Sequence, residues 1–250
     1  MKKNNLESEP KTFLGMPMRW DARNAFKGLW EKDDERLFTP KHFGIGWNLN
    51  FHALLKSAGI IKSKPQERDL NTLPSDLPVP QDDGACDHLT NMEVPEIKLR
   101  STNDRMVNLA TISKKPTVLF FYPRTGEPGK PAPANWDLIP GARGCTPQSC
   151  SFRDLYSEFK DEGYQVFGVS TQNSDYQKEF VTRNHIQFEI LSDAEFKLTD
   201  TLNLPTFVYK EMRLIKRMAL ILNGGKIVKF FYPVFPPNKN AETVLIWIRK

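Results

Sequence analysis

The C-terminal part of the chain alternates between apolar runs and stretches with helical spacing. Residues 116–122 form one continuous apolar run, which is typical of a strand in the middle of a sheet. The turn Asn223-Gly224-Gly225 joins the apolar segments 214–223 and 226–232 into a predicted hairpin. Further strands are expected at 97–99, 107–109, 166–170 and 188–191, and helices from 145 onward and at 174–184, 195–202 and 241–249. Strands that alternate with helices, followed by a hairpin and a closing helix, predict an α/β layer sandwich.

The N-terminal part has a different pattern, in which aromatic residues recur between short polar segments. Asp21 can cap a helix whose apolar face holds Ala22, Ala25, Phe26, Leu29 and Trp30. A second helix is expected at about 50–57, so residues 13–62 are predicted to form a small, mainly helical domain. The simplest role for its aromatic residues is the core; the alternative is an exposed face that docks a partner. The run from Asp34 to Asn50 resembles a small bacterial domain of unknown function, which supplies no activity.

A proline-rich segment separates the two parts. Residues 63–85 contain Pro65, Pro74, Pro78 and Pro80 among polar residues and are predicted to be a semi-rigid linker. Residues 1–12 are polar and are expected to be a disordered tail. The second domain is expected to span 86–250, a division that suits a chain of 250 residues.

Composition narrows the functional classes. The chain is 39% hydrophobic, but it has neither an apolar run as long as a membrane span nor an N-terminal signal peptide. Of the net charge of +5, residues 1–62 carry +4, from 11 basic and 7 acidic residues, which is too weak to argue for nucleic-acid binding. Three cysteines in a chain that is not expected to be exported indicate a reducing compartment, here the cytoplasm.

Two of the three cysteines, Cys145 and Cys150, lie five positions apart at the predicted start of a helix. Pro147 suits the first turn, where unpaired N–H groups and the helix dipole favour a thiolate at Cys145. On an intact helix the two Cα atoms are roughly 8 Å apart, too far for a disulfide without local unwinding. The pair is therefore interpreted as a redox switch; two inert buried thiols, or a metal site without a second ligand cluster, are the alternatives.

Several stretches together resemble the Q-type, or bacterioferritin-comigratory-protein-like, branch of the peroxiredoxins. They are Phe121-Tyr122-Pro123-Arg124, Gly144-Cys145-Thr146, Cys150 with Phe152-Arg153-Asp154, Val166-Phe167-Gly168-Val169-Ser170 and Leu191-Ser192-Asp193. The resemblance implies a thioredoxin-like three-layer sandwich over 86–250, with Cys145 as the peroxidatic cysteine, Cys150 as the resolving cysteine and Arg217 as the active-site arginine.

One departure concerns the hydroxyl that the family places three residues before the nucleophile. Ala142 occupies that position, and Leu138 occupies the position of the family's proline. The loop between Thr125 and Cys145 carries an insertion, so we expect Thr125 to fold back and supply the hydroxyl. Thr146 could contribute a hydroxyl from the helix side.

The resemblance implies a cytoplasmic two-cysteine peroxidase that acts on peroxides and is recycled by a thioredoxin- or glutaredoxin-like reductant. Such a peroxidase needs no cofactor or metal. Neither a nucleic acid nor a membrane is expected as a partner, and the protein is expected to be a monomer or a weak dimer. The alternatives are a peroxide sensor that signals through residues 13–62 and a scaffold with vestigial chemistry. Cys86 is expected to be structural, Arg124 and Arg143 loop charges, and His42, His52 and His185 surface or core residues.

Overall fold

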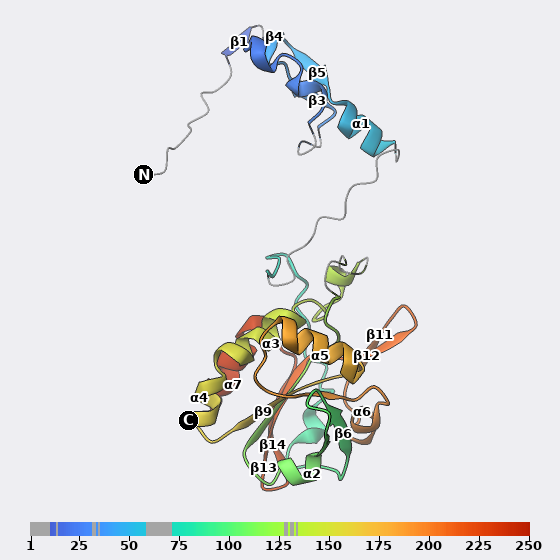
Figure 1. Ribbon diagram of the computed structural model, residues 1–250, viewed down its shortest axis with the longest axis vertical. Helices are drawn as coiled ribbons and strands as arrows, with labels where there is room; N and C mark the ends of the chain where they lie inside the picture. The colour runs from blue at the N-terminus through green and yellow to red at the C-terminus, as the bar shows by residue number, and fades with distance from the viewer. Residues whose placement is uncertain are drawn as a thin grey trace. The chain divides into compact units, whose positions relative to one another are not determined.

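A computed structural model describes residues 11–13, 15–31, 34, 36–58, 72–127, 130, 133 and 135–250. The chain forms two compact units, residues 1–66 and 67–250 (Figure 1). The expected tail, apart from residues 11 and 12, and positions 63–71 of the expected linker lie outside the described residues. No helix in the described ranges is long and apolar enough to cross a membrane.

The first unit consists mainly of short strands, so the expectation of a mainly helical domain is wrong. Strands β1 (Lys11–Phe13), β2 (Met16–Trp20) and β4 (Phe43–Ile45) form one antiparallel sheet, and β3 (Phe38–Pro40) pairs with β5 (Trp47–Leu49). The expected first helix is reduced to two 3₁₀ turns, η1 (Ala22–Asn24) and η2 (Lys27–Leu29), although Asp21 does cap η1 by accepting a hydrogen bond from the Arg23 N–H. The second helix is confirmed as α1 (Phe51–Ser57).

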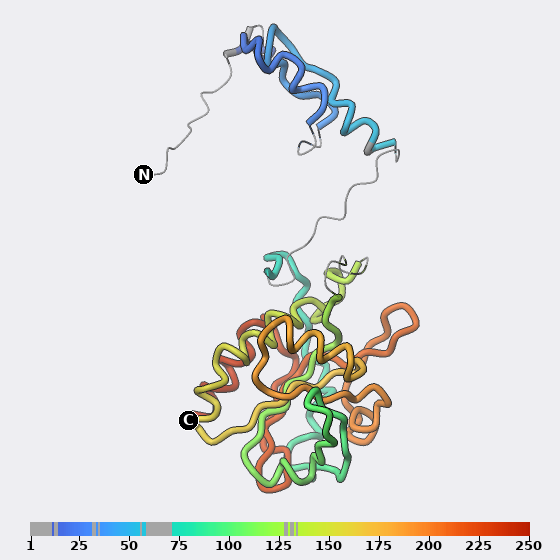
Figure 2. Tube along the Cα trace, in the orientation of Figure 1, coloured from blue at the N-terminus to red at the C-terminus, as the bar shows by residue number. Residues whose placement is uncertain are grey.

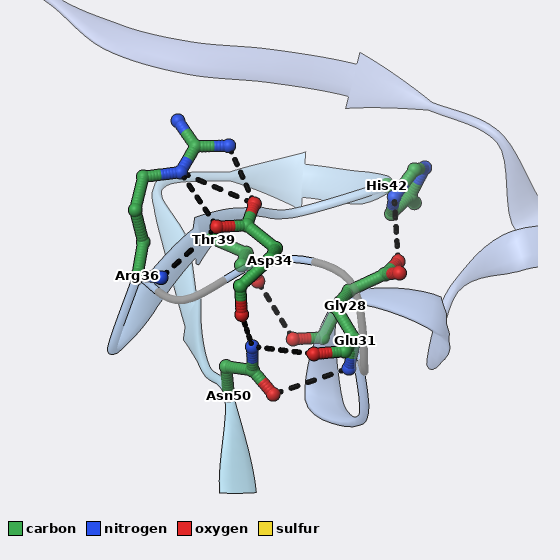
Figure 3. Close-up of polar contacts among 7 residues, drawn as sticks. All are labelled: Gly28, Glu31, Asp34, Arg36, Thr39, His42 and Asn50. Carbon is green, nitrogen blue, oxygen red and sulfur yellow. Dashed lines mark hydrogen bonds and ion pairs between the residues drawn. The ribbon is translucent and has the colours of Figure 1, made fainter. Parts of the chain in front are cut away.

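A polar network organises the interior of the first unit (Figure 3). The Asn50 side chain accepts a hydrogen bond from the Glu31 N–H at 3.1 Å and donates to the carbonyls of Glu31 and Asp34 at 3.0 and 2.9 Å. The buried Thr39 hydroxyl donates to the Gly28 carbonyl at 2.6 Å. These bonds tie η2 and the loop after it to β3 and to Asn50, the residue that follows β5. Polar groups thus take the place of an aromatic core.

The aromatic side chains whose exposure the structure describes in this unit are exposed rather than buried, which contradicts their expected role as a core. Trp20 is 67% exposed and Phe26 80%, and Ala53 is the only buried hydrophobic residue described in the unit. On the β2–β4 sheet, Trp20 stands opposite Phe43, with their rings 5.3 Å apart. The other exposed aromatic residues of the unit are Trp30, Phe38, Phe43, Trp47 and Phe51.

The second unit is built on a seven-stranded mixed sheet in the order β14-β13-β8-β9-β10-β6-β7. Its strands are β6 (Lys98–Ser101), β7 (Met106–Asn108), β8 (Thr117–Phe121), β9 (Gln165–Ser170), β10 (Ile190–Ser192), β13 (Met218–Asn223) and β14 (Lys226–Phe231). The expected apolar strand is the fully buried β8, which pairs parallel with β9 and antiparallel with β13. The expected α/β sandwich is therefore present.

Alternate residues of β8 feed two cores, one on each face of the sheet. Phe120 packs in the core beneath the longer helices, whereas Leu119 and Phe121 belong to the core on the opposite face. The longer helices are α3 (Cys145–Asp154), α4 (Tyr156–Asp161), α5 (Ser174–Arg183) and α7 (Asn240–Ile248). The short helices α2 (Leu109–Ile112) and α6 (Lys197–Thr201) cover the other face. Figure 1 shows α3, α4 and α7 gathered on one side of this unit.

The expected single strand 214–223 is broken at Lys216 and Arg217. Residues before the break belong to β12 (Met212–Ile215), which pairs with β11 (Thr206–Tyr209) in a separate hairpin that projects from the unit (Figure 2). The Lys216 N–H bonds to the Pro205 carbonyl at 2.8 Å instead of joining the central ladder. The break places Arg217 immediately before β13, at the sheet end that leads toward α3.

Residues 72–85, the second half of the expected linker, lie on the second unit. Arg143 donates to the Thr72 carbonyl at 3.3 Å. Asp83 accepts from the Lys216 ammonium at 2.8 Å. These contacts hold the segment beside the loop that leads into α3.

Candidate active site

The helix that carries the cysteine pair begins at Cys145 because Gly144 turns the chain there. Gly144 has φ of +102°, a conformation that favours glycine, and a Cβ at this position would overlap the Pro237 ring. Cys145 and Pro147 therefore occupy the first turn of α3, as the sequence predicted. The backbone N–H groups of a first turn have no partner within the helix and favour a negative charge at that end.

Arg217 lies against the sulfur of Cys145. Its Nη2 is 3.3 Å from the Cys145 Sγ and also donates to the carbonyls of Ala142 and Arg143, each at 3.1 Å. Its Nε donates to the Gly141 carbonyl at 3.2 Å, and the side chain is buried. One guanidinium thus fixes the loop before α3 and presents a positive charge to the sulfur, a task for which its rigid fork of donors is suited.

A buried glutamine on α3 extends this network, and sequence reasoning missed it. Gln148 accepts a hydrogen bond from Arg217 Nη1 and donates to the Asn240 side chain at 2.8 Å. Gln148 lies three residues after Cys145, so the helical periodicity places it near the same face. Asn240 begins α7, one residue before the start that the sequence predicted, but no local motif indicates that its side chain bonds to Gln148.

Cys145 opens into a pocket whose other wall is the inserted loop. Thr125, Thr146 and Gly144 line the pocket, together with Arg124, Gly126, Glu127, Lys130, Pro133, Trp136 and Arg143. Trp136 anchors the insertion, because its ring packs edge-on against Tyr209 of the β11–β12 hairpin at 5.2 Å. The insertion and the hairpin therefore form a small apolar cluster at one side of the sulfur.

Thr125 lies in this pocket, but its hydroxyl is bonded to Gln172. The hydroxyl and the N–H of Thr125 both donate to Gln172 Oε1, at 3.1 and 2.9 Å. Ala142, at the family's usual hydroxyl position, is buried and offers only its carbonyl, which lies 3.6 Å from the Cys145 Sγ. Arg124 and Arg143, expected as loop charges, both line the pocket.

Cys150 lies on the same helix as Cys145 and is only partly exposed. Burial raises the pKa of its thiol above the ordinary value. Both cysteines are free thiols, and ideal helical geometry separates their Cα atoms by about 8 Å. A disulfide between them therefore requires α3 to unwind locally.

Cys86 is fully buried in the core opposite α3, on the other face of the sheet from Cys145. Its sulfur contacts the Met218 sulfur at 4.0 Å. Burial, with a further contribution from Asp83 and Asp82, raises the pKa of its thiol to about 12. These surroundings support the expected structural role.

Comparisons with known proteins identify the family and the fold of the second unit. A family model described as Redoxin matches residues 89–245, more than half of the chain. The chain is 30% identical to peroxiredoxin Q of Sedum lineare over 152 residues, which cover 60% of this chain and 73% of that protein. It is equally identical to peroxiredoxin Q of Oryza sativa subsp. japonica over 154 residues, 61% of this chain, and spans only 63% of the length of the rice protein.

Solved structures show the same fold. Peroxidoxin BcpB from Mycobacterium tuberculosis superposes with a TM-score of 0.53 at 24% identity, covering 64% of this chain and 96% of that one. PrxQ from Xylella fastidiosa gives 0.53 at 19% identity, with 64% and 94% covered. These similarities confirm a thioredoxin-like peroxiredoxin fold for the second unit.

Proposed function

The chain belongs to the redoxin family, within its peroxiredoxin Q branch, and from this premise we propose that it is a thiol-dependent peroxidase. The Cys145 thiolate attacks the hydroxyl-bearing oxygen of a hydroperoxide. The S–O bond forms as the O–O bond breaks, the leaving alkoxide takes up one proton, and the products are a sulfenic acid and an alcohol, or water from hydrogen peroxide.

The observation that carries this proposal is the Arg217 guanidinium 3.3 Å from the Cys145 Sγ at the start of α3. A buried, permanent positive charge favours the thiolate, which is the nucleophilic form. The same donors, with the N–H groups of the first turn, can stabilise the oxygen on which charge develops as the O–O bond breaks.

Cys150 is the proposed resolving cysteine. The first turns of α3 unwind, and the Cys150 sulfur then attacks the sulfur of the Cys145 sulfenic acid. An intrachain disulfide forms, and the hydroxide that is displaced takes up the thiol proton and leaves as water. A thioredoxin- or glutaredoxin-like dithiol then reduces this disulfide by thiol exchange, so no metal, flavin or nucleotide takes part. Such a cycle requires a reducing compartment, for which we propose the cytoplasm.

The test is peroxide consumption by the wild type and by Cys145→Ser and Cys150→Ser, coupled to thioredoxin and thioredoxin reductase. We expect Cys145→Ser to abolish consumption and Cys150→Ser to give one oxidation per chain without turnover. Cys86→Ser is the matched control, because it removes a thiol in the opposite core. Full turnover by Cys145→Ser would refute the proposal.

A peroxide sensor is the second candidate, and the exposed aromatic residues of the first unit favour it. Apolar side chains such as Trp20 and Phe26 remain largely exposed on this unit, as on surfaces that bind partners. In this alternative, oxidation of Cys145 changes the binding of a partner to residues 13–62. Stoichiometric oxidation without turnover, accompanied by a change in partner binding, would support the sensor; sustained turnover with thioredoxin would support the enzyme.

A further inference from the structure

Gln172 holds every polar group of Thr125. Its Oε1 accepts the N–H and the hydroxyl proton of Thr125, at 2.9 and 3.1 Å, and its Nε2 donates to the Thr125 carbonyl at 3.3 Å. Tyr176 on α5 donates a second hydrogen bond to that carbonyl, at 2.9 Å. Thr125 is buried and lines the same pocket as Cys145, so this clamp sets the position of a pocket wall.

Gln172 is itself fixed from both sides. Its N–H donates to the Ser170 hydroxyl at 3.3 Å, where β9 ends. Its carbonyl accepts from the Ser192 hydroxyl at 2.7 Å, at the end of β10. The backbone of Gln172 is therefore held at the ends of two neighbouring strands of the central sheet, and its side chain reaches Thr125 in the loop that follows β8.

The backbone determines which way the protons point. The Thr125 N–H can only donate, so the Gln172 atom facing it must be the oxygen, and the Thr125 hydroxyl must donate to that same oxygen. The single hydroxyl proton is then used, and only the lone pairs of the Thr125 Oγ1 are left for the pocket. A hydroperoxide brings an O–H donor on the oxygen that the thiolate attacks, and such a donor pairs with an oxygen that has only lone pairs to offer.

We propose that Gln172 is a positioning residue that makes Thr125 a fixed hydrogen-bond acceptor for the hydroperoxide O–H. This inference rests on the proposed peroxidase function and assigns a residue that acts only through Thr125. It also explains how the proposed peroxidase works with an alanine at position 142. The acceptor comes from the other end of the inserted loop and is locked by a side chain of the β9–α5 connection.

The test combines Gln172→Met, Thr125→Val and the double variant in peroxide kinetics at several peroxide concentrations. Methionine keeps the length of the side chain and removes both hydrogen-bonding atoms. We expect each single variant to lower kcat/KM for hydrogen peroxide about tenfold, the equivalent of one neutral hydrogen bond, chiefly through KM. The double variant should lose no more than about twofold further, because both changes remove one interaction. Thr125→Ser, which keeps the hydroxyl, should retain most of the rate.

Alkylation of Cys145 by iodoacetamide separates positioning from general damage, since it needs the thiolate but no acceptor for a peroxide proton. We expect the alkylation rate of Gln172→Met to match the wild type, and the exposed Gln187→Met to match it in both assays. An unchanged kcat/KM in Gln172→Met, additive losses in the double variant, or an equal fall in alkylation would overturn the inference. A wild type that is alkylated at Cys145 but consumes no peroxide would instead refute the proposed function.

Discussion

Replacing Arg217 by lysine separates the charge of this side chain from its geometry. Lysine keeps a positive charge but has one compact ammonium group in place of a planar fork. Arg217 bonds simultaneously to the Cys145 sulfur, the Gln148 side chain and three loop carbonyls. An ammonium group has only three donors, so it cannot reach all of these acceptors.

The expected loss follows from the contacts that disappear. A hydrogen bond to a charged group contributes about 1.5–3 kcal/mol, and each 1.36 kcal/mol in the barrier changes a rate about tenfold. Arg217→Lys should therefore lower the rate constant for peroxide reduction between about 10-fold and about 100-fold. Arg217→Met should lose more, because the charge is lost and the buried carbonyls of Ala142 and Arg143 have no replacement donor.

The assay is single-turnover oxidation of the reduced protein by hydrogen peroxide in a stopped-flow instrument, with thermal unfolding measured in parallel. Arg105→Lys is a matched control, since Arg105 makes a similar forked contact with Glu189 at the surface, away from the cysteine pocket. If the rate constant of Arg217→Lys is within about threefold of the wild type and the fold is intact, the planar set of guanidinium donors is not needed for peroxide reduction. That result would refute the reasoning.

Three further predictions concern the surroundings of the site. Burial raises the pKa of Cys86 to about 12, so iodoacetamide at pH 8 should reach Cys86 only after unfolding, whereas it should label Cys145 in the folded protein. Peptide mapping would show this, and labelling of folded Cys86 at the rate of a free thiol would contradict it. Gly144→Ala should destabilise the fold by at least about 2 kcal/mol in urea unfolding, since the new Cβ overlaps Pro237 and the positive φ adds strain. Gly163→Ala, with a positive φ but open space around the new Cβ, should cost less. Equal losses in the two variants would contradict the steric argument. The hydrogen bonds from Lys216 and Tyr232 lower the pKa of Asp83 to about 2, so its carboxylate stabilises the fold above the ordinary pKa and this contribution is lost as the pH falls from about 4 to about 2. Because Asp83 is half exposed, Asp83→Asn should cost below about 1 kcal/mol at pH 7 and clearly less at pH 2, where the carboxylate is about half protonated; a loss that grows on acidification would contradict the sign.

The sequence carried enough information to predict the central sheet and the cysteine helix. The continuous apolar run of β8 and the proline two residues after Cys145 are local signals, and both elements are where the pattern indicated. The break between β12 and β13 was not predicted, because the apolar residues on both sides of Lys216 and Arg217 have the pattern of a single strand. Long-range pairing, with β11 on one side and β8 on the other, decides where each strand ends.

The site was predictable only where a motif carried it. Arg217 lies against the Cys145 sulfur, the two residues that the resemblance pointed to. Thr125, which we expected to fold back toward Cys145, lines the same pocket, and its role stays a prediction. Gln148 and Gln172 were missed, because a glutamine has no characteristic spacing and both act through contacts between distant segments. In the first unit, aromatic density indicated a core, yet the structure buries Asn50 and Thr39 instead.

The central claim is that Cys145 and Cys150 form a disulfide within one chain when peroxide oxidises the protein. Mass spectrometry of the reduced protein treated with one equivalent of hydrogen peroxide, followed by non-reducing peptide mapping, tests it directly. The account predicts the loss of two hydrogen atoms per chain, one cross-linked peptide containing both residues, and no such species in Cys145→Ser or Cys150→Ser. Both thiols remaining free after peroxide treatment, or a cross-link that uses Cys86 instead, would contradict it.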